Sequence, residues 1–144
     1  MLFPQGSQAV EPLPDGNQLA RTIRELIPEK NIEIRATMEV IERERKRLKT
    51  GIVIRVEKPG QAQWCITYEA TRDGKTAEQW RVCHELGKAN RYEYNGRPAK
   101  SAETHSGLAG SSFYIADFGM EFLHWPSQTV LKTQRRKSRL CHVL

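Results

Sequence analysis

Hydrophobic positions recur along this chain with two different periods. Between Asp15 and Pro28, aliphatic side chains fall at offsets of zero, four, seven and eight, at Leu19, Ile23, Leu26 and Ile27. This spacing predicts a helix that buries one face. Asp15 is suited to cap the first turn of that helix, and Pro28 ends it because proline cannot continue a helix.

From residue 31 onward the period changes to two, which is typical of half-buried strands. Alternating segments occupy positions 32–40, 52–56, 64–68, 80–84 and 91–94, and two more follow at 129–134 and 139–144 around a basic turn. The connections between the first five are too short for crossover helices, so we expect an antiparallel meander.

The apolar pattern also predicts a register. If Trp64, Ile66 and Tyr68 share a face with the strand at 80–84, a three-residue loop centred on Gly74 pairs Ile66 with Val82. This register sets Cys65 opposite Cys83 on the outer face. A direct cross-strand disulfide is often strained, so the sequence favours two unpaired thiols over a bond, and both alternatives stay open.

The remaining segments complete a single domain over residues 1–144. Residues 1–14 form an extended lead-in, residues 95–112 are small and polar and predict a flexible loop, and residues 111–124 predict a second, short helical cover. Within that cover, Gly119 is expected to separate two short segments. We therefore predict a mainly β (α+β) fold, a curved antiparallel sheet or half-open β-barrel with an N-terminal helix.

The formal net charge of +6 is concentrated in two basic segments, 42–49 and 132–139. These turns could contact a membrane, a receptor or nucleic acid, although charged hairpin tips are commonly only solvated. An alternative function is therefore a basic nucleic-acid-binding module that uses six cations: Arg45, Lys46, Arg47, Arg135, Arg136 and Lys137. The strand aromatics lie on the apolar face, away from these cations, which disfavours nucleic acid as a partner.

Catalytic and metal motifs are missing from the sequence. The three cysteines and four histidines lack metal-ligand spacing, and we expect no metal and no cofactor. Ser111, Ser112, Asp117 and His124 lie near one another in the sequence, but no nucleophile-elbow glycine pattern accompanies them. We therefore expect that the protein is not an enzyme.

The segment GSSFYIADF (110–118), followed by EFLHWP (121–126) and RLCHVL (139–144), resembles the outer membrane lipoprotein-sorting proteins of bacteria, the LolA-like family. The resemblance implies a half-open barrel closed by helices, a periplasmic location, and a carrier of lipid or of lipoprotein acyl chains that has no catalytic activity. The N-terminus lacks the pattern of a signal peptide, and the last strand ends while still apolar. We therefore expect an N-terminal fragment of such a protein, whose exposed last strand could pair with a second copy as a homodimer.

This interpretation assigns roles to particular side chains. Eight residues are predicted to form the lipid-binding wall: Ile34, Met38, Ile54, Trp64, Ile66, Trp80, Val82 and Tyr92. Four residues of the helical cover are predicted to form a lid over one mouth: Phe113, Phe118, Phe122 and Leu123. The apolar interior between them is either packed solid or partly open for a hydrophobic ligand.

Overall fold

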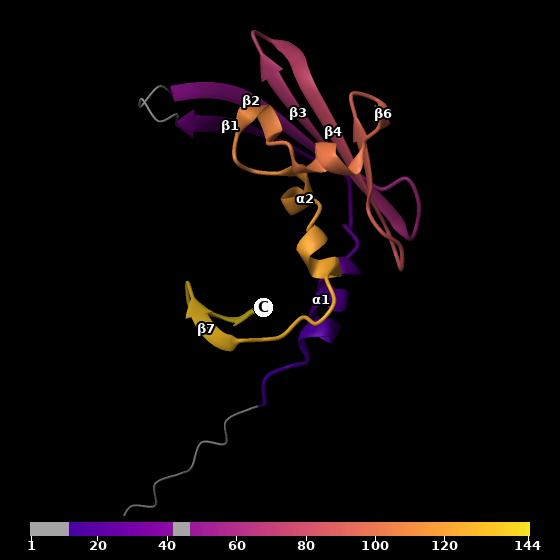
Figure 1. Ribbon diagram of the computed structural model, residues 1–144, viewed down its shortest axis with the longest axis vertical. Helices are drawn as coiled ribbons and strands as arrows, with labels where there is room; N and C mark the ends of the chain where they lie inside the picture. The colour runs from indigo at the N-terminus through magenta and orange to yellow at the C-terminus, as the bar shows by residue number, and fades with distance from the viewer. Residues whose placement is uncertain (1–11, 42–46) are drawn as a thin grey trace, which may run out of the picture.

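A curved antiparallel sheet of six strands forms the body of the protein (Figure 1). The structure, a computed structural model, describes residues 12–41 and 47–144. Its strands follow one another in chain order: β1 Ile32–Ile41, β2 Arg47–Glu57, β3 Gln63–Arg72, β4 Lys75–Glu85, β5 Arg91–Tyr94 and β6 Arg97–Pro98. Strands β1 and β6 lie at opposite edges and do not pair with each other, so the sheet stays open. The predicted mainly β, half-open architecture is confirmed.

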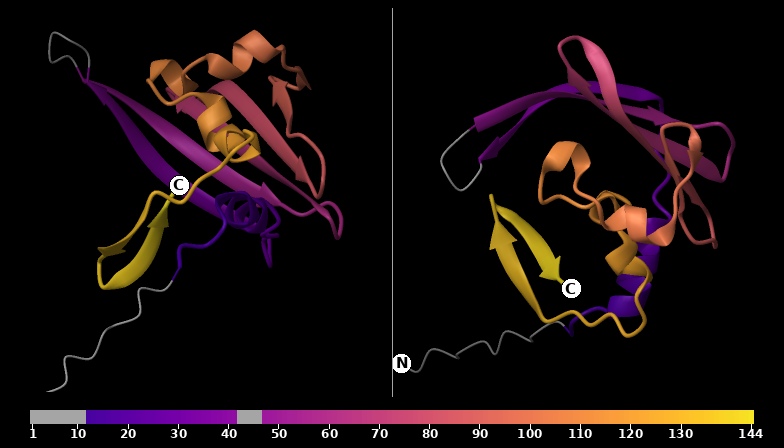
Figure 2. Two further views of the ribbon diagram at one scale, coloured as in Figure 1. Left: turned by 60° about the horizontal axis from the view of Figure 1, so that its bottom comes forward. Right: turned by 45° about the horizontal axis from the view of Figure 1, so that its top comes forward.

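Short helices cover the concave face of this sheet (Figure 2). They are α1 Gly16–Arg24, α2 Ile115–Phe118 and the 3₁₀ turns η1 Ser101–His105, η2 Leu108–Gly110 and η3 Glu121–His124. Strands β7 Lys132–Arg136 and β8 Arg139–Val143 form a separate hairpin that lies apart from the sheet. Among the described residues, no helix is long and apolar enough to cross a membrane.

The N-terminal helix begins after Asp15, and the helical cover lies within residues 111–124, as the sequence predicts. The helix ends at Arg24 rather than at Pro28, so Leu26 and Ile27 lie beyond it, and Leu26 is 66% exposed. Asp15 caps α1 by accepting a hydrogen bond of 2.7 Å from the backbone N–H of Gln18. Gly119 and Met120 separate α2 from η3, and Met120 adopts a left-handed conformation with φ of 55°. Because the left-handed backbone breaks the helical hydrogen-bond ladder, the cover consists of two short pieces rather than one helix.

Residues 95–112 differ from the predicted flexible loop. They form β6, η1 and η2, and the side chain of Leu108 is only 2% exposed in the core. The sequence misled because the segment is mostly small and polar, whereas one leucine at a sharp turn is enough to anchor it against the sheet. Of the predicted extended lead-in, residues 1–11 lie outside the described part of the chain.

The register between β3 and β4 agrees with the predicted pairing. Ile66 lies opposite Val82, and Cys65 lies opposite Cys83. The predicted three-residue turn is wrong, since the turn consists of Asp73 and Gly74 alone. A register irregularity beginning at Ala70 accounts for the difference, because an extra residue in β4 restores the pairing that a longer turn would have given.

Cys65 and Cys83 are joined by a disulfide, with an S–S distance of 2.10 Å. This corrects the sequence-based preference for two unpaired thiols. Both residues are buried, at 1% and 5% exposed, and the predicted register brings their Cα atoms to 4.1 Å. The third cysteine, Cys141 on β8, is free.

The two faces of the sheet differ in chemistry because side chains alternate along each strand. The concave face carries the buried core, which includes Ile52, Tyr68, Trp80 and Val82. The convex face carries ion pairs, among them Arg55 between Glu33 and Glu69, at 3.0 and 2.7 Å. These pairs hold the pKa of both carboxyls below the ordinary range. The disulfide lies on this charged face.

We expect the disulfide to stabilise the fold. Replacing both Cys65 and Cys83 by alanine should lower the free energy of unfolding by about 3 kcal/mol, because the bond closes a loop across 18 residues and restricts the unfolded chain. Guanidinium unfolding followed by tryptophan fluorescence measures the change. Cys141→Ala is the matched control and should leave the midpoint unchanged. Equal stability of all three proteins would contradict the prediction.

Candidate functional site

An apolar groove runs between strands β1 to β3 and the helical cover. Its volume is about 270 Å³, and its lining includes Met38, Ile52, Ile54, Leu108, Phe113 and Phe118. A cavity of this size is close to the lower end of the range for ligand pockets in proteins. Because nearly all of the lining is hydrocarbon or aromatic ring, the groove favours an apolar guest.

Two phenylalanines of the helical cover, Phe113 and Phe118, form the side of this groove opposite the sheet. The ring of Phe118 lies 5.0 Å from the ring of Tyr68 on β3 and 6.3 Å from the ring of Phe113. Phe118 is half-buried, whereas Phe113 is 59% exposed at the rim. The groove therefore has one packed end beside Tyr68 and one open end beside Phe113.

The structure divides the predicted lipid-binding wall among several places. Met38 and Ile54 line the groove, while Ile34 lies on the outermost strand and is 49% exposed. Trp80 and Val82 are packed in the core, at 1% and 0% exposed. The other predicted wall residues are partly buried against the core (Ile66, Tyr92) or line a different cavity (Trp64).

The four predicted lid residues are also divided. Phe113 and Phe118 line the groove, whereas Leu123 is buried beneath η3 and Phe122 is 43% exposed away from the groove. The short cover has two faces, and only the α2 side of it turns toward the groove. Of the four predicted lid residues, only Phe113 and Phe118 border the groove.

Two half-buried glutamates attach the cover to the sheet. Glu78 on β4 accepts a hydrogen bond of 2.7 Å from the Trp80 indole and one of 2.8 Å from the backbone N–H of Ala109 in η2. Glu121 in η3 accepts hydrogen bonds from the Tyr92 hydroxyl at 2.6 Å and from the Asn90 amide at 2.9 Å. These charge-assisted bonds fix both ends of the cover over the groove.

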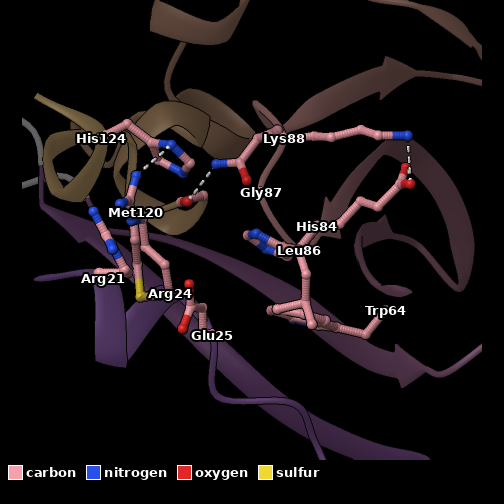
Figure 3. A pocket seen from close by; sticks show the side chains of 13 residues that line it. Arg21, Arg24, Glu25, Trp64, His84, Leu86, Gly87, Lys88, Met120 and His124 are labelled. Atoms are coloured by element: carbon pink, nitrogen blue, oxygen red, sulfur yellow. Dashed lines mark hydrogen bonds and ion pairs between the residues drawn. The ribbon is translucent and has the colours of Figure 1, made fainter. Parts of the chain in front are cut away.

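A second cavity, the histidine cavity, lies where α1, the end of β4 and η3 meet (Figure 3). Its volume is about 320 Å³, and its lining includes Arg21, Arg24, Trp64, His84, Asn90 and His124. His84 is paired with Trp64 across β3 and β4 and stacks on it at 5.1 Å between ring centroids. Arg24 donates to Nδ1 of His124 at 3.1 Å.

Burial is the main influence on both histidines of this cavity. Burial lowers the pKa of His84, and the nearby charge of His124 lowers it further, whereas Asn90 and Glu121 oppose the shift. For His124, burial and the neighbouring Arg24 guanidinium lower the pKa. Both rings are therefore held neutral at pH 7.

Sequence reasoning missed this cavity because its residues are far apart in the chain. Arg24 and His124 are separated by 100 positions, and no spacing in the sequence joins them. The available signal was weak: Arg21 and Arg24 lie three positions apart at the end of the predicted helix, and His84 continues an apolar strand face. Only the docking of α1 against η3 brings these groups together.

The basic residues of the alternative function lie elsewhere. Arg135 and Arg136 end β7, Lys137 follows in the turn, and all three are exposed at the tip of the β7–β8 hairpin. Arg47 begins β2 and lies 3.4 Å from Glu39. Arg45 and Lys46 lie outside the described residues.

Ser111 and His124, two of the candidate catalytic residues, make other contacts. The Ser111 hydroxyl accepts from the backbone N–H of Phe113 at 3.2 Å, and His124 is bonded to Arg24. Within the described residues, no hydrogen bond joins His124 to Ser111, Ser112 or Asp117. Nor does the described part of the chain contain a group of three His, Cys, Asp or Glu residues placed to hold a metal ion.

Comparison of the chain with protein-family models, with curated proteins and with solved structures finds no match in any of the three. The apolar groove and the histidine cavity are therefore the two features from which a function is inferred.

Close packing at Gly119 should make the cover sensitive to a single methyl group. A Cβ at Gly119 would overlap the Tyr92 hydroxyl, so Gly119→Ala should lower the free energy of unfolding by about 1–3 kcal/mol. Thermal unfolding measures the loss. Gly60→Ala is the control, because its Cβ would meet nothing closer than 4.0 Å. The loss caused by Gly119→Ala should be smaller in a Tyr92→Phe background than in the parent chain, and an equal loss in both backgrounds would contradict the assigned contact.

The neutral histidines predict a pH dependence of stability. Because the pKa of His84 and of His124 in the folded chain lies below the ordinary value for histidine, about 6.5, the unfolded chain binds more protons as the pH falls below about 6.5. The free energy of unfolding should therefore decrease from pH 7.5 to pH 5. His84→Gln should flatten this dependence, and His142→Gln on the β7–β8 hairpin is the control. Identical pH profiles for His84→Gln and the parent protein would count against a buried neutral His84.

Proposed function

We propose that the protein is a non-catalytic carrier that holds an acyl chain, of a lipid or of a lipid-modified protein, in the apolar groove. The observation that carries this proposal is the groove itself, with Met38, Ile54 and Phe118 around a volume of about 270 Å³. The resemblance of the segments at 110–126 and 139–144 to lipoprotein-sorting proteins agrees with this assignment.

The free energy of binding would come from the hydrophobic effect. Each methylene removed from water contributes about 0.8 kcal/mol, so a chain of several methylenes gains enough to bind reversibly. The apolar surface continues beyond the groove along β1, where Ile32 and Ile34 are 42% and 49% exposed. An acyl chain longer than the groove would follow this strip of hydrophobic surface.

The attachment of the cover supports loading and release rather than permanent enclosure. Phe113 and Phe118 contact the groove, while Glu78 and Glu121 hold the segments on either side of them. The aromatic side chains between these two attachments can change rotamer without breaking either set of hydrogen bonds. The groove can therefore widen locally while the sheet stays intact.

A periplasmic location forms part of the proposal. The Cys65–Cys83 disulfide supports an oxidising compartment, because such bonds persist in the periplasm and are rare in the cytosol. Transfer between two membranes across the periplasm requires a carrier that shields acyl chains from water, and an open half-barrel with a helical cover provides that shielding.

Displacement of a dansyl-labelled fatty acid tests binding. The probe should bind saturably, and Met38→Glu or Phe113→Glu should weaken it about tenfold or more, because each variant places a charge in an apolar site. Leu131→Glu, at a leucine that is 70% exposed on the connection before β7, is the matched control. Equal affinity of Met38→Glu and Leu131→Glu would contradict the groove as the site.

Carrier activity requires a further measurement. Labelled lipid should move from donor to acceptor vesicles faster in the presence of the protein, and Met38→Glu should remove this acceleration. Titration with short DNA and RNA at two salt concentrations tests the alternative. Tight, steeply salt-dependent binding that is lost in an Arg135→Gln, Arg136→Gln double variant, together with no probe binding, would replace the carrier proposal with the nucleic-acid one.

A further inference from the structure

The histidine cavity contains a buried polar atom that the protein leaves without a partner. The His84 side chain lines the cavity and is 94% buried, being 6% exposed. Its Nε2 atom has no hydrogen-bond partner among the described residues. Buried polar atoms are normally satisfied, and this one belongs to a residue that lines a cavity of about 320 Å³, where a ligand group could complete it.

The cavity is rich in hydrogen-bond donors. Arg21 and Arg24 come from the last turn of α1, and neither guanidinium lies within 4.0 Å of a carboxylate oxygen within the described part of the chain. A guanidinium has five N–H donors and is always protonated. Arg24 uses one nitrogen on Nδ1 of His124, which leaves the Nε2 proton of His124 as a further donor.

Few acceptors oppose these donors. Lys88 and Glu85 neutralise each other through an ion pair of 2.6 Å, and Glu25 is the other carboxylate that lines the cavity. Among the lining side chains alone, two arginines against one glutamate leave an excess of one positive charge while both histidines are neutral. Glu121 faces the rings from outside this lining, and its carboxylate accepts hydrogen bonds from the Tyr92 hydroxyl and the Asn90 amide. A metal cation or an amine would meet this excess unfavourably, whereas an anion with several oxygens would be stabilised.

We propose that the histidine cavity binds a phosphate group, with Arg21 and Arg24 on one side and the rings of His84 and His124 as further donors. The donors come from α1, β4 and η3, so they approach from three directions, which suits the several oxygens of a tetrahedral anion rather than a planar carboxylate. The site is separate from the apolar groove, and this inference does not rest on the carrier function.

The bound anion would be coupled to a proton. The ionisable groups that face the two rings come from α1, the end of β4, the segment after it and η3: Arg21, Arg24, Glu25, Glu85, Lys88 and Glu121. Burial disfavours an imidazolium at both rings, and the Arg24 guanidinium disfavours one at His124 as well. A phosphate dianion reverses the local charge, so it should raise the pKa of both histidines and bind with uptake of a proton.

Nuclear magnetic resonance of the histidine side chains tests the proposal on the intact chain. The ring signals of His84 and His124 are titrated with pH in the absence and in the presence of inorganic phosphate, glycerol phosphate or a soluble short-chain phosphatidic acid. Phosphate should bind saturably, raise the pKa of His84 by a measurable amount, and leave the ring of His142 on β8 unchanged. Chloride at matched ionic strength controls for screening.

Variants separate a site from general charge. Arg24→Gln should weaken binding about tenfold or more, since it removes a charge-assisted donor. Arg21 is exposed, so Arg21→Gln keeps the fold and should also weaken binding, while Arg135→Gln on the hairpin should not. Retained thermal unfolding of Arg21→Gln makes its result interpretable even if Arg24→Gln fails to fold.

The three probes distinguish the source of the phosphate. Binding of all three supports recognition of the phosphate group itself, and binding of phosphatidic acid alone, lost in Arg21→Gln, supports the head group of a lipid. If none of the probes shifts His84, or if Arg135→Gln weakens binding as much as Arg21→Gln, the proposal is overturned.

Discussion

The structure depends on covering one apolar face of an open sheet. Six strands in simple order place Ile52, Tyr68, Trp80 and Val82 on the concave side, and an unclosed sheet cannot bury them by itself. The cover that does so is only a few short turns, whose own hydrogen bonds are too few to hold it. Glu78 and Glu121 supply the missing attachment, because each accepts from a strand side chain and Glu78 also from the cover backbone.

This arrangement leaves two cavities that meet at the C-terminal end of α2. The apolar groove lies beside Phe118, and the histidine cavity begins at Gly119, the next residue in the chain. One short segment therefore borders both a hydrocarbon-lined space and a donor-rich one. The groove proposed for an acyl chain and the cavity proposed for an anion both follow from the same shortage of covering residues.

The convex face has a different role. Arg55 joins Glu33 on β1 to Glu69 on β3, so ion pairs cross three adjacent strands on the wet side of the sheet. Exposed pairs of this kind contribute little free energy each, and their main effect is to keep the outer face soluble and the register unambiguous. The Cys65–Cys83 bond joins β3 to β4 covalently and so fixes the register of these two strands at the centre of the sheet.

The sequence by itself determined the strands, the capped helix, the break at Gly119 and the pairing of Ile66 with Val82, because alternation and local backbone preferences are written within a few residues. It could not determine which apolar residues of the concave face would be buried in the core and which would line a groove. Trp80 and Met38 point to the same face of the sheet. Trp80 is buried in the core and Met38 lines the groove because different segments pack against their two strands. The disulfide and the joining of Arg24 to His124 were likewise decided by tertiary structure, since both depend on the distance between groups that lie far apart in the chain.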